Sequence, residues 1–371
     1  MEIFPKPSGP FSVGTVVKHC IDTERSERYS SEKNPRELLI QIWYPAKTVN
    51  SQPKTFYAQD VMSEWTDGLA QSGFPVEHIE ELKNLTTYAQ ENVPLCQSKK
   101  PYPLLLFCHG YVALRSAYTA YCQELASHGF IVVGIAYTYY TQITKLPDGK
   151  TIYALPEHSS QIKLTNEIES QAEQTLWLED TEFILDTLQT LNENKNPENI
   201  FYHAIDFNNV GIFGHSFGGS TALQMCRHDE RIKAAVDLDG GLFGDHATEP
   251  IGKPIMIIVG QNSFESYQQH DDAEIAQETG FSKEIIATLR KKYFEYIPRL
   301  VKASPNASFI MIKDAKHAAF SDWAFLKHLP LYHENKQIFD LEQQTGNIDG
   351  SETTRCINNL LVNFFDQYLK S

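Results

Sequence analysis

Short runs of apolar residues recur along the chain, and each is ended by polar residues, glycine or proline. Continuous apolar runs of this length are typical of strands that are buried on both faces of a sheet. We therefore expect strands near residues 38–44, 103–108, 130–137, 210–213, 234–238, 254–259 and 307–312.

Segments in which apolar residues recur at helical spacing lie between several of these runs. Between the second and third, apolar residues recur at helical spacing from Ala117 to Leu125 and stop at Gly129, where a helix would end. A second helical face extends from Leu176 to Leu191, before the run at 210–213. Helices that alternate with buried strands indicate an α/β fold, with a mostly parallel central sheet and helices on both faces.

The chain has 371 residues, which is long for one domain, but α/β folds reach this size through loop insertions. We expect a single domain over 1–371 with an insertion at about 55–96. Apolar residues at helical spacing in the insertion predict one or two short helices packed on the core. A lid or an interfacial surface is the alternative. The residues that carry this spacing are Val61, Met62, Trp65, Leu69, Ile79 and Leu82.

Charge and cysteine usage exclude two kinds of partner. A formal net charge of -15, with no face dense in lysine and arginine, argues against nucleic acid. The cysteines lack the close pairs of a zinc site or a disulfide framework, so we expect no metal and interpret them as small buried residues. They are Cys20, Cys96, Cys108, Cys122, Cys226 and Cys356.

The apolar segments are too short for a membrane span, which needs roughly 20 consecutive apolar residues. We therefore predict no transmembrane segment, although peripheral contact with a membrane is compatible with the sequence. The N-terminus shows no basic stretch followed by an apolar run, as an export signal would. A cytoplasmic location is expected, or a secreted one if a signal peptide preceded Met1.

Ser216 carries the strongest chemical signal in the chain. It lies in Gly214-His-Ser-Phe-Gly218, between an apolar strand-like run and a helix-like segment. This Gly-x-Ser-x-Gly pattern in that context predicts a nucleophile elbow, a tight turn that exposes a serine hydroxyl. The glycines permit the close backbone approach that such a turn requires. A glycine-rich turn with an incidental serine is the alternative.

A nucleophilic serine needs a histidine base, and in this fold the chain order is serine, acid, histidine. His317 is the best candidate, because it follows the expected strand at 307–312 on a loop above the sheet. His246 and His270 lie in weaker contexts. His328 and His333 lie later, among helix-like or proline-bounded residues.

The acid that orients the base is expected at Asp239, which ends the run at 234–238 and precedes two glycines. Asp237, within the same run, is the alternative and is expected to point to the other face. Glu265 is the candidate after the next strand. Asp314 is more consistent with a surface turn.

Acyl transfer also needs backbone N–H groups at the position where an oxyanion develops. The residue after the nucleophile, Phe217, offers one such group, and Tyr111, after His109-Gly110, offers a second. A tight strand-to-loop turn at His109-Gly110 is compatible with the same residues.

Together these segments resemble the plasma-type platelet-activating factor acetylhydrolase family, a branch of the α/β-hydrolases, and its bacterial relatives in particular. The resemblance implies Ser216 as nucleophile, Asp239 as acid, His317 as base, and Tyr111 and Phe217 as oxyanion donors. The segments that carry it are Gly9-Pro-Phe-Ser-Val-Gly14, Tyr102-Pro-Leu-Leu-Leu-Phe-Cys-His-Gly110, Ala126-Ser-His-Gly-Phe-Ile-Val132, Gly214-His-Ser-Phe-Gly-Gly219, Leu238-Asp239, Gly346-Asn-Ile-Asp-Gly350 and Phe364-Phe-Asp-Gln-Tyr-Leu369.

The expected activity is that of a serine carboxylester hydrolase without a cofactor. By the resemblance, its reference substrate is a glycerophospholipid with a short sn-2 acyl group, and a small soluble ester is the alternative. Gly240 and Gly241 are expected to widen the acyl pocket, and Phe243, Phe320 and Trp323 to line it or to lie in the core. A non-catalytic binding module on the same fold is the rival from another class. A complete set of serine, acid and histidine argues against it.

Overall fold

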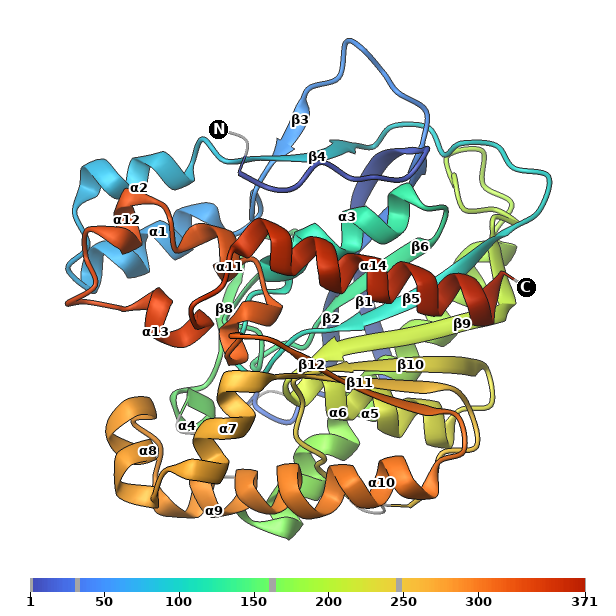
Figure 1. Cartoon of the computed structure of the whole chain (residues 1–371). Coiled ribbons are helices and arrows are strands. Elements are labelled where there is room, and N and C mark those ends of the chain that lie inside the picture. The colour runs from blue at the N-terminus through green and yellow to red at the C-terminus, as the bar shows by residue number, and fades with distance from the viewer. Residues whose placement is uncertain (1–2, 31–33, 160–164, 245–248, 371) are drawn as a thin grey trace.

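A central sheet organises the computed structural model, which describes residues 3–30, 34–159, 165–244 and 249–370. Within these residues the sheet has ten strands, in the order β12-β11-β10-β9-β5-β6-β2-β1-β4-β3 (Figure 1). The strands are β1 (Ser12–Ser26), β2 (Pro35–Ala46), β3 (Lys54–Phe56), β4 (Thr86–Glu91), β5 (Tyr102–Cys108), β6 (Ile131–Ala136), β9 (Ile205–His215), β10 (Ile232–Leu238), β11 (Ile255–Gly260) and β12 (Ala307–Ile312).

Every strand expected from an apolar run is present. The six from β12 to β6 pair in parallel, which confirms the mostly parallel sheet. β2 pairs antiparallel with both β6 and β1. The strands β1, β3 and β4 were not expected, because their buried and exposed residues alternate or are mixed, so they contain no continuous apolar run. A separate hairpin is formed by β7 (Ile143–Lys145) and β8 (Thr151–Tyr153).

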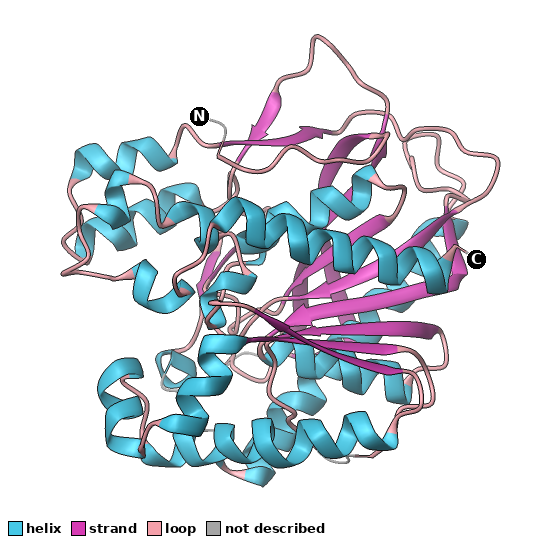
Figure 2. Ribbon diagram, in the orientation of Figure 1, coloured by secondary structure: helices cyan, strands magenta, loops and turns pink. Residues whose placement is uncertain are grey.

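Helices cover both faces of the sheet, as Figure 2 shows. α3 (Thr119–Ser127) and α14 (Gly350–Leu369) pack on one face, and α5 (Glu167–Glu193) and α6 (Phe217–His228) pack on the other. Successive strand side chains point to opposite faces, so Leu105 and Phe107 belong to one core, while Leu104 and Leu106 belong to the other. The sheet therefore lies between two apolar cores.

Each end of the helix α3 is fixed by a specific residue. At its start, the Asp322 carboxylate accepts hydrogen bonds from the amides of Thr119 and Ala120, at 2.8 and 3.2 Å. The first amides of an α-helix lack acceptors within that helix, so a distant aspartate serves as the cap of α3. At its end, Gly129 adopts φ +93°, a conformation that favours glycine. This is the stop that the sequence predicted.

The segment expected as an insertion contains β3, α1 (Met62–Gln71), α2 (Val76–Leu82) and β4. The two short helices confirm the helical spacing, and Trp65, Ile79 and Leu82 are buried in the core beside α3. β4 pairs in parallel with β1, so the segment also extends the sheet. Its treatment as an insertion in one domain stays a prediction.

Apart from η1, the remaining helices lie after β8. None of the described helices combines the length and the apolar composition that crossing a bilayer would need. They are η1 (Arg115–Tyr118), α4 (Pro156–Ser159), α7 (Gln261–Gln269), α8 (Asp272–Thr279), α9 (Lys283–Lys291), η3 (Lys292–Tyr296), α10 (Ile297–Ala303), η4 (His317–Phe320), α11 (Trp323–Leu326), α12 (Pro330–His333) and α13 (Leu341–Thr345).

Candidate active site

Ser216 lies in the sharp turn between β9 and α6. Its backbone has φ 57° and ψ −123°, a conformation that residues other than glycine rarely adopt. The turn is held because the Ser216 amide donates to the carbonyl of Leu238, at 3.0 Å. A Cβ on Gly214 would lie 2.1 Å from the carbonyl oxygen of Gly218, and one on Gly218 would lie 2.2 Å from that of Cys108. Both glycines are therefore needed for the backbone contacts of the turn.

The hydroxyl of Ser216 is hydrogen-bonded to His317, with 3.0 Å between Oγ and Nε2. On the other side of the imidazole, Nδ1 lies 2.6 Å from Oδ2 of Asp239. A carboxylate can only accept, so Nδ1 donates to Asp239 and Nε2 is left to accept the serine proton. The second carboxylate oxygen of Asp239 accepts from the Gly260 amide at 2.8 Å, which fixes the orientation of the side chain.

These three residues meet because of the sheet topology. Ser216 follows β9, Asp239 follows β10, and His317 follows β12, and these strands run in parallel. The carboxyl ends of parallel strands lie at one edge of a sheet, where α/β proteins place their sites. The structure therefore brings together the serine, acid and histidine that the sequence analysis favoured.

The alternative acids lie elsewhere. Asp237 lies within β10, where it is fully buried and accepts a hydrogen bond from the Gly240 amide at 2.8 Å. Strand parity does not separate it from Asp239, because residues two apart share a face; Asp239 differs because it lies just beyond the strand with φ 50°. Burial raises its pKa well above the usual range. Glu265, on α7, accepts from the side chain of Gln261, and Asp314 occupies a turn with φ 57°.

The alternative bases do not contact Ser216 in the part of the chain that the structure describes. His270 lies 3.3 Å from the hydroxyl of Ser266, and His333 lies 3.4 Å from a carboxylate oxygen of Glu342. His328 lies between α11 and α12, and partial burial lowers its pKa. His246 lies outside the described residues.

A cavity of about 170 Å³ opens beside Ser216, and Tyr111, Phe217 and His317 line it as well. Much of its wall comes from the segment 261–303, which the sequence analysis did not connect with the site. This segment forms α7 to α10 between β11 and β12 (Figure 1). Its contributions to the wall are Ser263, Ser266, Tyr267, Ile275, Thr279, Phe281, Leu289 and Tyr293.

The residues expected to shape the acyl pocket divide into two groups. Gly241 and Phe243 line the cavity. Phe320 is instead fully buried in the core, and Trp323 packs edge-on against other aromatic rings of that core. A Cβ on Gly240 would lie 2.2 Å from Oδ1 of Asp237, so this glycine is explained by packing behind the acid.

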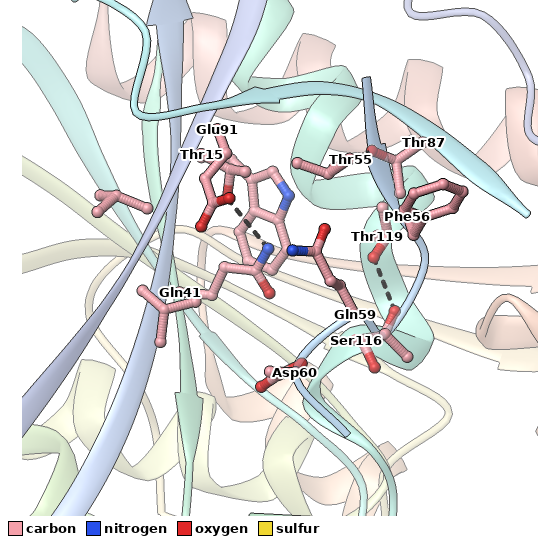
Figure 3. A pocket seen from close by; sticks show the side chains of 14 residues that line it. Thr15, Gln41, Thr55, Phe56, Gln59, Asp60, Thr87, Glu91, Ser116 and Thr119 are labelled. Carbon is pink, nitrogen blue, oxygen red and sulfur yellow. Dashed lines mark hydrogen bonds between the residues drawn. The ribbon is translucent and has the colours of Figure 1, made fainter. Parts of the chain in front are cut away.

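A second cavity, of about 140 Å³, lies at β1, β2 and β4, away from the elbow (Figure 3). Nine of its 14 lining residues have polar or charged side chains, and Gln41 donates to the hydroxyl of Thr15 within it at 3.0 Å. It contains no histidine, so the arrangement required for a nucleophilic serine is absent from its described lining. The described residues also contain no group of three or more potential ligands arranged to hold a metal ion.

The fold and the site define the α/β-hydrolase class: a nucleophile elbow, with acid and histidine after neighbouring strands of a mostly parallel sheet covered on both faces. The model of the family described as "Platelet-activating factor acetylhydrolase, isoform II" matches residues 1–371, so the chain belongs to that family. This confirms the family that the sequence segments resembled.

Individual relatives agree with this assignment. A platelet-activating factor acetylhydrolase of Cavia porcellus is 26% identical over 98% of this chain and 78% of its own length. A probable 1-alkyl-2-acetylglycerophosphocholine esterase of Arthroderma benhamiae is 26% identical over 67% of this chain and 62% of its own length. Among solved structures, a ferulic acid esterase from Streptomyces cinnamoneus superposes with a TM-score of 0.72 at 20% identity, covering 100% of this chain and 93% of its own. That last similarity supports the fold alone.

Proposed function

We propose that this protein is a serine carboxylester hydrolase that removes a short acyl group from the sn-2 position of phospholipids resembling platelet-activating factor. The observation that carries the proposal is the hydrogen-bonded series Ser216–His317–Asp239 at the mouth of an apolar cavity. Membership of the acetylhydrolase family and the names of the relatives support the substrate class.

In the acylation step, the Ser216 hydroxyl attacks the ester carbonyl carbon and passes its proton to Nε2 of His317. The resulting tetrahedral intermediate collapses when the carbon–oxygen bond to the glycerol breaks, and His317 returns the proton to the departing alcohol. Water, deprotonated by His317, then attacks the acyl-enzyme and releases the carboxylic acid and free Ser216. No cofactor is required.

Asp239 acts through His317. By accepting from Nδ1, it selects the tautomer in which Nε2 can take the serine proton, and its negative charge stabilises the imidazolium that forms. The Asp239 side chain is fully buried, whereas His317 has 49% of its side-chain surface exposed, so the acid is held while the base faces the substrate.

The amides of Tyr111 and Phe217 are the proposed donors to the oxyanion. Phe217 is the first residue of α6, and the first N–H groups of a helix have no partner within it. Tyr111 lines the same cavity from the loop after β5. In other acyl-transfer enzymes, one such donor lowers the barrier by roughly 3 kcal/mol.

A second candidate function is the hydrolysis of small soluble esters. The cavity volume of about 170 Å³ favours a short acyl group but does not restrict the alcohol portion of the ester. Peripheral contact with a lipid surface, which a phospholipid substrate would favour, stays a prediction.

The test compares p-nitrophenyl esters of increasing acyl length with a short-acyl phospholipid, using wild type, Ser216→Ala and a control at an exposed serine, Ser72→Ala. We expect activity on the phospholipid, a steep fall with acyl length, and loss of both activities in Ser216→Ala only. Turnover of soluble esters without the phospholipid would favour the second candidate. Near-normal turnover by a folded Ser216→Ala protein would refute the mechanism.

A further inference from the structure

A series of hydrogen bonds passes behind the elbow and joins three segments of the site. The Gly110 amide donates to the hydroxyl of Tyr118 at 3.1 Å. That hydroxyl lies 2.8 Å from Nδ1 of His215, and Nε2 of His215 lies 3.1 Å from the carbonyl oxygen of His317.

The chemistry of the two ends assigns the protons in between. The Gly110 amide can only donate, and the His317 carbonyl can only accept. His215 must therefore carry its proton on Nε2, which leaves Nδ1 as an acceptor for the Tyr118 hydroxyl. Every donor in the series then meets an acceptor, and the arrangement requires a neutral imidazole at position 215.

The surroundings favour that neutral state. Tyr118 and His215 are 1% and 5% exposed. Burial lowers the pKa of His215 well below the usual range, and a positive charge on the neighbouring His317 lowers it further. The rings of His215 and His317 lie 4.5 Å apart, so a second cation there would oppose the imidazolium that forms on His317 during the reaction.

The segments that this series joins are those on which the proposed reaction depends. Gly110 precedes Tyr111, His215 precedes Ser216, and His317 is the base. Gly110 packs directly on the series: a Cβ there would lie 3.1 Å from both Nδ1 of His215 and the hydroxyl of Tyr118. The oxyanion loop, the elbow and the backbone of the base therefore share one buried polar connection.

We propose that Tyr118 and His215 are positioning residues that hold the oxyanion loop and His317 in place relative to Ser216. The inference rests on the proposed function. Neither side chain acts on the substrate. Their effect is to keep the Tyr111 amide and the His317 ring aligned with the serine hydroxyl. Errors of about 1 Å in such an alignment can reduce turnover by roughly 100-fold.

The test uses two pairs of variants and p-nitrophenyl acetate. Tyr118→Phe removes the hydroxyl and keeps the ring, and its control is Tyr121→Phe, which removes another buried hydroxyl from the same helix region. His215→Phe removes both ring nitrogens. His215→Gln retains a donor and an acceptor and does not titrate.

We expect Tyr118→Phe and His215→Phe to fold and to lose about tenfold or more in kcat with little change in KM, because the alignment matters most in the transition state. Tyr121→Phe should retain wild-type kcat, and His215→Gln should recover part of the loss seen in His215→Phe. Wild-type kcat in Tyr118→Phe, or equal losses in the two His215 variants, would overturn the proposal.

A measurement on the wild-type protein tests the proposal even if a variant fails to fold. Nitrogen-15 NMR of the imidazole side chains should find His215 neutral and protonated on Nε2 throughout the pH range in which activity rises. A proton on Nδ1, or a charged ring, would also overturn the proposal. Loss of activity in Ser216→Ala together with an unaffected Tyr118→Phe would refute the positioning role alone and leave the esterase mechanism standing.

Discussion

Asp239 and His317 are joined by a hydrogen bond of 2.6 Å between residues 78 positions apart in the chain. The carboxylate lies at the end of β10, and the imidazole begins η4, beyond β12. Asp237, two residues before Asp239, lies within the strand, and its side chain accepts a hydrogen bond from the Gly240 amide. Residues two apart in a regular strand share a face, but Asp239 lies just beyond β10 with φ 50°, and this turn gives the two aspartates different surroundings that mutation can separate.

Asp239→Asn is expected to lower kcat by about 10⁴-fold, because an amide favours the wrong tautomer of the base. Asp237→Asn should leave kcat within about threefold of wild type, because burial raises the pKa of Asp237 and so favours the neutral acid, which an amide resembles, and because an amide oxygen can still accept from Gly240. Steady-state hydrolysis of p-nitrophenyl acetate checks both. A larger loss in Asp237→Asn than in Asp239→Asn would exchange their roles.

Gly214→Ala is expected to prevent formation of the native elbow, because its Cβ would lie 2.1 Å from a backbone oxygen that cannot move independently. Gly68→Ala is the matched control, since it lies within α1 and a Cβ there meets nothing within 4 Å. Replacing a helical glycine in open space should raise the free energy of unfolding by roughly 0.5–1 kcal/mol. Chemical denaturation measures both, and a native-like Gly214→Ala protein would contradict the packing argument.

Asp322 is expected to make the stability of the protein depend on pH. Burial raises its pKa to about 7, against the opposing effect of hydrogen bonds from Ala120 and Thr119. An unfolded aspartate titrates near pH 3.9, so between about pH 4 and pH 7 the folded protein holds a proton that the unfolded chain has lost. The stability that the protonated group contributes is full below that window and is lost as pH rises through it.

Asp322→Asn, which does not titrate, tests this dependence. The difference in unfolding free energy between wild type and variant should fall as pH rises through the window, by at most about 1.4 kcal/mol per pH unit. Urea denaturation at several pH values measures it. A constant difference would show that Asp322 does not change its protonation there.

Alkylation of the native protein is expected to label Cys356 first, because it is exposed, and to leave esterase activity unchanged. Cys96 is partly buried and should react next. Burial raises the pKa of the Cys108 and Cys226 thiols to about 12, so these should resist. Peptide mass spectrometry locates the label while activity is followed. Loss of activity in step with labelling would indicate a thiol in the site and weaken the serine mechanism.

The sequence predicted the parts of the fold whose signals are local. Strands such as β9 and β11 are buried on both faces, so their apolar runs are continuous. β1 was not predicted, because exposed polar residues such as Glu24 interrupt its apolar pattern and because its pairing with β2 and β4 depends on other segments of the chain. Local patterns therefore identify the centre of the sheet better than its edge.

The same distinction holds for the site. Ser216, Asp239 and His317 each follow a recognisable strand in the order that the fold requires, so the sequence predicted them. The role inferred for Tyr118 depends on the contact between its hydroxyl and His215, 97 positions later in the chain. The hydrogen bond by which Asp322 caps α3 joins residues 203 positions apart. Contacts of this kind arise from the tertiary arrangement, and no spacing in the chain encodes them.

The helical segment between β11 and β12 separates the shape of the cavity from the placement of the nucleophile. Ser216, Asp239 and His317 are anchored at the ends of sheet strands, whereas Tyr267, Ile275, Phe281 and Leu289 come from one continuous stretch of helices. Mutations in that stretch can change the shape of the acyl site without moving the nucleophile. A library confined to 261–303 would therefore be an economical route to esterases of new selectivity.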